Sequence, residues 1–401
     1  MKRNKIYIEN IFFLVIAIYI AFLQLFSEDI LFYGLFLLFL FLFVCNGIEI
    51  RKNKLLLWGI PILYMVFSIC YTYSVDSGIK YSVVIIICWF IGVVLSNTDD
   101  WGRRFYKNLV PILGIHVMFT LFSIVFKEVA LETSKWILPS DIYNMTARWV
   151  RENGNFAGIS GQTVTNALFF SILLGISVSG ILVKGKTVAR VVACVMLLGL
   201  LFATGKKAAV AACFLAVLAI AVMKYKSQGK KLKIPIIIIT VFILIAIIVF
   251  VSLGHEKLEA LMGTSVISRI RILKNVQVIF EKNPFWGSGI DSVAFFVGHS
   301  AHNNFVQLLC EYGMIGCTLF ICVIGCVLID VVIKSYYCLN DRNIERTEKV
   351  MVLFAVYYQV YFLLTGFFES TLFNYRMVLV YFITIAGVYS VERKRERTIN
   401  T

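Results

Sequence analysis

The chain has 401 residues, of which 60% are hydrophobic and only 15% are charged, and its formal net charge is +15. Soluble domains are about half apolar and about a quarter charged, so this composition excludes a soluble protein. Apolar stretches of roughly 20 residues, the length that crosses a bilayer as a helix, recur along the whole sequence. The sequence therefore predicts an all-α, polytopic membrane protein.

In chain order, about twelve transmembrane helices are predicted from the apolar stretches. They lie near residues 8–26, 30–48, 55–73, 78–95, 106–126, 158–182, 187–204, 207–223, 234–253, 304–333, 350–368 and 376–390. The first stretch follows MKRNK and leads directly into the second without a small-residue cleavage site. We therefore expect it to be a membrane anchor rather than a signal peptide.

Lysine and arginine gather in alternate connecting segments, and this pattern predicts the orientation. The basic segments are 1–9, 49–54, 96–107, 183–190, 224–233, 334–349 and 391–401, whereas the rest of the chain is nearly neutral. Because positive residues resist translocation, we expect these segments, and both termini, in the cytoplasm. The basic charge thus needs no nucleic-acid partner, since KYKSQGKKLK is a short loop flanking the lipid bilayer.

This topology divides the chain into five parts. They are the N-terminal transmembrane helices (1–126), a first large outer loop (127–157), the central transmembrane helices (158–253), a second large outer loop (254–303) and the C-terminal transmembrane helices (304–401). Loops of this length usually carry function. We therefore expect the functional site on the extracytoplasmic face.

Cations lie where the central helices meet the outer face. Arg148 and Arg151 precede a glycine-rich polar run that enters the sixth predicted span, which indicates a water-filled mouth. Lys206 and Lys207 lie at the outer end of another span, where lysine departs from the positive-inside pattern. Both pairs are unexpected there unless an anionic ligand binds nearby.

The second large loop carries two further motifs. Arg269 and Arg271 alternate with apolar residues, a pattern that fits either an interfacial helix with snorkelling cations or a site for phosphate oxygens. The segment NPFWGSG adds a proline turn and two glycines. Its Trp286 is suited to stack on a sugar ring or to anchor the loop at the membrane interface.

The segment GHSAHNN places two of the four histidines directly before a long apolar span. Asn303 or Asn304 is suited to cap this helix, which leaves His302 at its positive end, where a neutral imidazole able to accept a proton is favoured. Gln307 and Glu311 continue a polar stripe into the bilayer. An acid at that depth is a candidate functional residue, although a structural histidine and a paired glutamate remain the alternative.

Metal binding is not expected. His299 and His302 are three residues apart, but no cysteine and no clear acidic third ligand accompany them. The ten cysteines lie almost entirely within predicted spans and form no CxxC pair, so they are interpreted as apolar packing residues. We expect no cofactor, and a supporting hydrogen bond is the role favoured for His299.

Together these motifs resemble the O-antigen ligase and oligosaccharide repeat-unit polymerase (Wzy-type) superfamily. The residues that match its signatures are His302, Asn303, Gly313 and Gly316, with Arg269 and Leu273 in the outer loop. EKNPFWGSGID and GNFAGISGQTVTNAL resemble two further family motifs, so the resemblance covers roughly residues 146–316. Lys206 and Lys207 stand where the family often has Ser-Arg, so the chain departs from the family pattern at this cation.

The resemblance implies a GT-C-like glycosyltransferase in a bacterial cytoplasmic membrane. Its donor would be an undecaprenyl-diphosphate-linked oligosaccharide, used on the outer face without a metal. His302 and Arg269 would be catalytic, with His302 taking a proton from the acceptor hydroxyl. The candidate substrate-binding residues are Arg271, Lys206, Lys207, Arg148, Arg151, Glu311, Trp286 and His299.

Three functions are compatible with these motifs. We expect a polymerase that joins repeat units into a capsule, exopolysaccharide or O-antigen, because the Lys/Ile/Asn-rich chain fits an AT-rich genome and many Gram-positive bacteria have polymerases but no lipopolysaccharide. A flippase and a chain-length regulator would be its partners. A ligase that transfers the polysaccharide to another acceptor is the nearest alternative. A flippase or transporter would want its polar groups near the midplane, whereas here they cluster at the outer mouth.

Overall fold

The computed structural model describes residues 2–22, 34, 37, 53–229 and 272–400. All regular secondary structure in these residues is helical, which confirms the predicted all-α class. Residues 272–282 are also helical. The elements are α1 (Lys2–Phe22), η2 (Lys54–Trp58), α3 (Gly59–Ser68), η3 (Ile69–Tyr71), α4 (Val75–Ser96), α5 (Trp101–Val125), α6 (Lys127–Ile137), α7 (Ser140–Asn153), η4 (Gly158–Ser160), α8 (Thr163–Lys184), α9 (Val188–Ala203), α10 (Lys207–Ser227), α13 (Ser292–Val297), α14 (Asn304–Asn340), α15 (Arg346–Thr365), η5 (Thr371–Phe373) and α16 (Tyr375–Asn400).

Among the described residues, 8 helical stretches are long and apolar enough to cross a membrane. They are Lys54–Tyr71, Val75–Ser96, Trp101–Val125, Thr163–Lys184, Lys207–Ser227, Asn304–Asn340, Arg346–Thr365 and Tyr375–Thr398. Two shorter apolar helices, Asn10–Phe22 and Val188–Ala203, coincide with further predicted spans. The multi-pass membrane architecture is thus confirmed. The spans predicted near 30–48 and 234–253 lie almost wholly outside the described residues.

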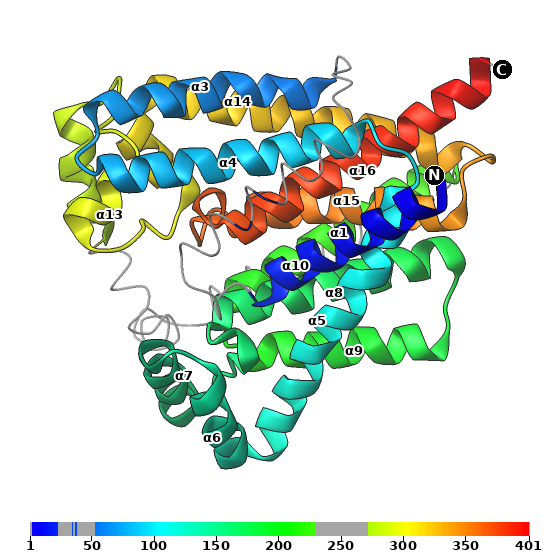
Figure 1. Cartoon of the computed structure of the whole chain (residues 1–401), viewed down its shortest axis with the longest axis horizontal. Coiled ribbons are helices and arrows are strands. Elements are labelled where there is room, and N and C mark those ends of the chain that lie inside the picture. The colour runs from blue at the N-terminus through cyan, green and yellow to red at the C-terminus, as the bar shows by residue number, and fades with distance from the viewer. Residues whose placement is uncertain (1, 23–33, 35–36, 38–52, 230–271, 401) are drawn as a thin grey trace, which may run out of the picture.

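The helices form two groups joined by a central pair. On one side, α3, α4 and α14 lie next to one another, and on the other α8, α9 and α10 pack together (Figure 1). Between them, α15 contacts α8 and α10, while α16 contacts α4 and α14. In the most apolar stretch of α16, 94% of the residues are buried inside the protein. This helix is therefore the centre of the apolar core.

The segment predicted as the first large outer loop, 127–157, forms α6 and α7, which pack together through Leu131, Ala147 and Val150. Pro139 stands immediately before α7, where its missing amide hydrogen costs no helical hydrogen bond. Gly154 ends the helix in the left-handed conformation that glycine adopts most readily. This segment is thus an ordered helical pair that follows α5 and begins in contact with it.

The long helix α14 is broken at Gly313, whose φ of 65° and ψ of −172° lie outside the helical region. The segment 283–289 fills the break with its backbone. The amides of Ser288 and Gly289 donate to the carbonyl oxygens of Cys310 (2.9 Å) and Glu311 (2.9 Å). In the other direction, the amides of Met314 and Ile315 donate to the carbonyl oxygens of Pro284 (2.8 Å) and Phe285 (3.2 Å). Backbone groups freed by the break thus find partners inside the protein, as a membrane-spanning helix requires.

Glycine is required at this junction for steric reasons. A Cβ on Gly313 would lie 2.2 Å from the carbonyl oxygen of Phe285, and one on Gly287 would lie 2.4 Å from that of Glu311. Both positions have positive φ, where L side chains are rarely found. The NPFWGSG motif (283–289) and Gly313 therefore meet in one close contact between their backbones.

We predict that Gly313→Ala destabilises the protein. The backbone conformation alone costs a non-glycine residue roughly 1–3 kcal/mol, and the contact with Phe285 adds to that cost. Gly325→Ala in the same helix is the matched control, because a Cβ there meets no atom within 4 Å. Thermal unfolding of the detergent-solubilised variants measures the difference. Equal melting temperatures for the two variants would contradict the steric role of Gly313.

Candidate functional site

Three segments that are distant in the sequence meet at the carboxylate of Glu369. Its Oε2 lies 3.1 Å from Nδ1 of His302, in the loop before α14. Its Oε1 lies 3.6 Å from Nζ of Lys206, in the turn between α9 and α10. The exposed fractions of the side chains are 14% for Glu369, 32% for Lys206 and 41% for His302. The carboxylate is therefore shielded while the imidazole stays open to solvent, and we call this group the His302–Glu369–Lys206 cluster.

The start of α14 holds His302 in place. Asn303 is the N-cap residue, and its Oδ1 accepts hydrogen bonds from the amides of Phe305 (2.9 Å) and Val306 (3.1 Å). This resolves the choice between the two asparagines as the cap. His302 precedes the cap with a φ of 51°, in the left-handed region. That conformation ends the loop directly beside Glu369.

The loop that carries Glu369 is tied to α14 by Asn304. The Asn304 amide donates to the carbonyl oxygen of Gly366 (2.7 Å), and its side chain donates from Nδ2 to Thr371 Oγ1 (2.6 Å). Its Oδ1 accepts a hydrogen bond from the amide of Leu372 (3.0 Å). Because Asn304 is 4% exposed, these bonds are protected from water. Adjacent residues at one helix start thus position both the imidazole and its carboxylate partner.

The imidazole has one nitrogen committed and one available. When Nδ1 carries the proton and donates to Glu369, Nε2 keeps its lone pair and can accept a proton from a hydroxyl group. His299 lies on the same loop with its ring centroid 5.9 Å from that of His302, and its Nδ1 contacts the carbonyl oxygen of Ser300 at 2.9 Å. Of the two histidines, His302 is the one that contacts the carboxylate in the part of the chain that the structure describes.

The polar segment at the start of α8, which was predicted to line a water-filled mouth, forms hydrogen bonds within the protein. Asn166 is buried, and its Nδ2 donates to Thr120 Oγ1 (3.0 Å) and to the carbonyl oxygen of Phe156 (3.1 Å). The amide of Phe156 in turn donates to the carbonyl oxygen of Ala203 (2.9 Å), two residues before Gly205. These bonds tie the glycine-rich run to the turn that presents Lys206. They give that run a structural role in the site.

The structure places the remaining predicted cations in different surroundings. Lys207 is the first residue of α10 and is exposed. On α7, Arg151 pairs with Glu128 at 2.9 Å and Arg148 with Glu152 at 3.9 Å, and all four side chains are more than half exposed. Within residues 53–229 and 272–400, no ion pair joins these two arginines to the cluster. Arg269 and Arg271 lie outside the described residues.

Glu311 and Trp286 lie at the break in α14 rather than in the cluster. The Glu311 side chain is fully buried and accepts a hydrogen bond from Nε2 of Gln307 (3.0 Å). Trp286 is 56% exposed and stacks on Tyr64 with ring centroids 6.5 Å apart. Burial also raises the pKa of Asp291, just after the inserted segment, above its usual value. Glu311 thus contacts the segment 283–289 that fills the break in α14, and Trp286 belongs to that segment.

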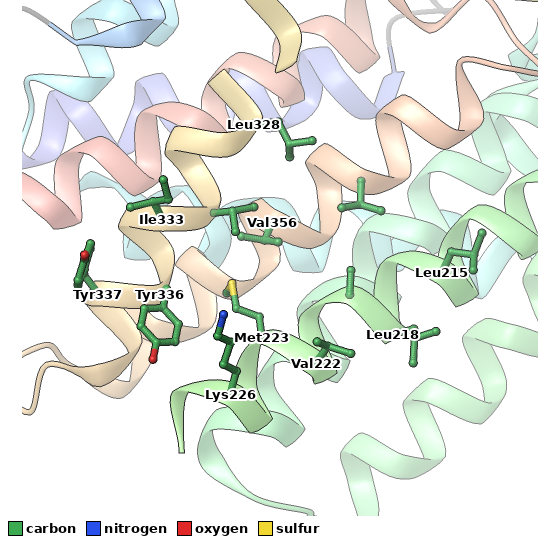
Figure 2. Close-up of a pocket in the computed structure, with 13 residues that line it drawn as sticks. Leu215, Leu218, Val222, Met223, Lys226, Leu328, Ile333, Tyr336, Tyr337 and Val356 are labelled. Carbon is green, nitrogen blue, oxygen red and sulfur yellow. The ribbon is translucent and has the colours of Figure 1, made fainter. Parts of the chain in front are cut away.

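An apolar pocket of about 850 Å³ lies between α10, α14 and α15, and Figure 2 shows its lining. Its residues include Leu215, Val222 and Lys226 of α10 and Ile333 of α14. Lys226 lies about 30 Å from Lys206 along α10, at 1.5 Å per residue. None of the three cluster residues lines the pocket, which is therefore separate from the cluster.

Among the described residues, no group of three or more His, Cys, Asp or Glu side chains is arranged to hold a metal ion. What the cluster offers instead is an open imidazole nitrogen, an oriented carboxylate and an ammonium group. Such a set can remove a proton from a hydroxyl and can attract an anion.

A comparison with known protein families agrees with this reading. Residues 192–321 match one family model. That model describes the O-antigen ligase family, and the match covers less than half of the chain. The matched stretch includes Lys206, His302 and the break at Gly313, and it confirms the predicted resemblance to the O-antigen ligase and Wzy-type superfamily. No curated protein matches the chain.

Glu369 is the site residue that the sequence motifs did not identify. It lies outside the matched stretch and 67 residues after His302. One signal was present: Glu369 is an acid in the short turn between two apolar spans, FFESTLF, where the adjoining residues are mostly apolar. An isolated acid in such a turn is a candidate partner for cations at the same end of the helices.

We predict that Asn304→Ala weakens both stability and activity. The change leaves the buried Leu372 amide without its acceptor, at a cost of about 1–3 kcal/mol, removes the hydrogen bond to the Thr371 hydroxyl, and frees the loop that positions Glu369. Thermal unfolding and glycan synthesis are measured together. Asn340→Ala, at the exposed far end of α14, is the control and is expected to behave like the wild type. An unchanged Asn304→Ala protein would show that the loop is held by other contacts.

Proposed function

We propose that this protein is a polymerase that joins undecaprenyl-diphosphate-linked oligosaccharide repeat units on the outer face of a bacterial cytoplasmic membrane. The observation that carries the proposal is the His302–Glu369–Lys206 cluster, which combines a base with a cation at the start of two apolar helices. The O-antigen ligase family match supports glycosyl transfer as the reaction class. The charge pattern of the connecting segments supports an extracytoplasmic site with both termini in the cytoplasm.

In the proposed reaction, Nε2 of His302 removes the proton from an acceptor sugar hydroxyl. The resulting oxygen attacks the anomeric carbon of the donor, so that a glycosidic bond forms and the bond between that carbon and the phosphate oxygen breaks. Undecaprenyl diphosphate leaves with its negative charge, which Lys206, Arg269 and Arg271 would stabilise. The proton then passes from His302 to solvent.

The membrane location suits such a donor. Its polyprenyl chain would remain among the lipids while its diphosphate and saccharide reach the cluster, which adjoins the N-terminal ends of α10 and α14. Arg148, Arg151 and Lys207 are exposed cations available to the remaining charge, and Trp286 and His299 are exposed rings available to the saccharide. A flippase that delivers the donor and a chain-length regulator are the proposed partners.

Ligation is the second candidate, because the matched family model is that of O-antigen ligase. A ligase would use the same base and the same donor, and the acceptor would be a different molecule. The product distinguishes the two: a polymerase lengthens a lipid-linked chain, whereas a ligase moves a finished chain to another carrier.

We predict that His302→Ala nearly abolishes polymer and leaves single repeat units on the lipid. Loss of a general base lowers a rate by roughly 10²–10⁴-fold. His299→Ala should cost much less, because that residue has no contact with Glu369 in the described structure. The measurement is a glycan ladder from a deletion strain that expresses each variant at matched protein level. A full ladder from His302→Ala would remove the assigned base.

We also predict that the double change Arg269→Ala and Arg271→Ala raises the KM for the lipid-linked donor strongly. Two fewer cations would leave the diphosphate, and the charge that develops on it, less stabilised. Arg342→Ala is the matched control, since Arg342 is exposed in a segment assigned to the cytoplasm. Normal donor use by the double variant would assign the anion site to other cations.

A further inference from the structure

We propose that Glu369 is a positioning residue that couples Lys206 to His302, so that arrival of the donor diphosphate at Lys206 makes His302 a stronger proton acceptor. This inference rests on the proposed function, because it takes His302 as the base and Lys206 as a contact for the anion. It adds a regulatory role for a carboxylate that the family motifs did not point to.

The two oxygens of one carboxylate serve two partners. Oε2 contacts Nδ1 of His302 at 3.1 Å, and Oε1 faces Nζ of Lys206 at 3.6 Å. With 14% of the Glu369 side chain exposed, these interactions are screened by water far less than those of a surface pair. Asn303 also donates from Nδ2 to the carbonyl oxygen of Phe367 (3.0 Å), which holds the backbone just before the carboxylate.

Positioning comes from the contact with Nδ1. A proton on Nδ1 that is donated to Glu369 leaves the Nε2 lone pair free for the acceptor hydroxyl. When Nε2 takes that proton, the ring becomes an imidazolium, and the adjacent negative charge stabilises it without itself becoming protonated. This is the role that a buried carboxylate has beside a catalytic histidine in hydrolases.

Lys206 and His302 are coupled because both interact with the negative charge of Glu369. In the free protein, the Lys206 ammonium partly compensates Glu369 and disfavours a second cation beside it, so it opposes formation of the imidazolium. A diphosphate next to Lys206 compensates the ammonium instead. More of the carboxylate's field then acts on His302, and proton transfer to Nε2 becomes more favourable.

Among the described residues, two other titratable side chains lie close to His302 or Glu369. His299 lies on the loop of His302 with a ring-centroid distance of 5.9 Å. Tyr361, on α15, interacts electrostatically with Glu369. Neither is changed in the test below, so a shift in the pH profile reports on Glu369 and Lys206.

The test measures initial rates of chain extension in proteoliposomes with a lipid-diphosphate-linked repeat unit, between about pH 5 and pH 9, the range in which a histidine base titrates. Glu369→Gln is expected to lower kcat by roughly 10²–10⁴-fold. It should also move the acid limb of the profile to lower pH, because the imidazolium has lost its negative partner. Glu281→Gln is the control, since Glu281 is an exposed glutamate that accepts a hydrogen bond from Gln277, and no change is expected.

The proposed effect of donor binding on His302 can be measured separately, from the pH dependence of kcat and of kcat/KM. In the wild type, the acid limb of kcat, which reports the donor complex, should lie at higher pH than that of kcat/KM, which reports the free enzyme. In Lys206→Gln this separation should disappear and the KM for the donor should rise. Coincident limbs in the wild type would overturn the coupling.

Glu369→Asp separates positioning from folding, because it keeps the charge on a shorter side chain. We expect an intermediate kcat with an acid limb near that of the wild type. A wild-type kcat and profile in Glu369→Gln would overturn the proposal, as would lost activity in both variants with no shift of the limb. The proposed function would still stand if His302→Ala were inactive, whereas an active His302→Ala would remove both.

Discussion

The requirement that every backbone polar group find a partner inside the membrane governs this architecture. Helix α14 is the long span that follows His302, and it could not be interrupted at Gly313 without exposing amides and carbonyls. The segment 283–289 supplies the missing partners through four backbone hydrogen bonds. Through these hydrogen bonds, the segment 283–289 is attached to the same helix whose first residue, Asn304, holds the Glu369 loop. The placement of the candidate site therefore depends on a broken helix whose freed backbone groups pair with the segment 283–289.

Short polar side chains do the rest of the positioning. Asn303 caps α14 and contacts the carbonyl oxygen of Phe367, while Asn304 binds both sides of the turn around Glu369. On the other side of the cluster, Asn166 and the Phe156 amide hold the loops next to the turn of Lys206. Each of these amide groups forms a hydrogen bond with a backbone atom as well as orienting a loop, so the site is stabilised by the same bonds that shape it.

The sequence predicted the parts of this structure that depend on local pattern. Apolar stretches gave the spans, and the His-Asn-Asn start of α14 gave the cap and the candidate base. The pairing of Glu369 with His302 was not predictable, because it joins residues 67 apart through the packing of α14 against α15. Gly313 was identified from the sequence as a signature residue, whereas the structure shows that it permits a break in α14. The ion pair of Arg151 with Glu128 likewise requires α6 to lie on α7.

The position of the cluster explains why an acid, a lysine and a histidine are found together at the end of an otherwise apolar bundle. Lys206 is the N-cap of α10, and His302 precedes the N-cap of α14, so two positive helix ends flank Glu369. The positive electrostatic potential of these helix ends favours an anion, and in the free protein that anion is the carboxylate of Glu369. A diphosphate donor would enter the same field and take a share of the same cation. The carboxylate of Glu369 and an incoming phosphate would thus compete for Lys206, because of where the two helices begin. This competition would place the effect of donor binding at His302, the proposed base.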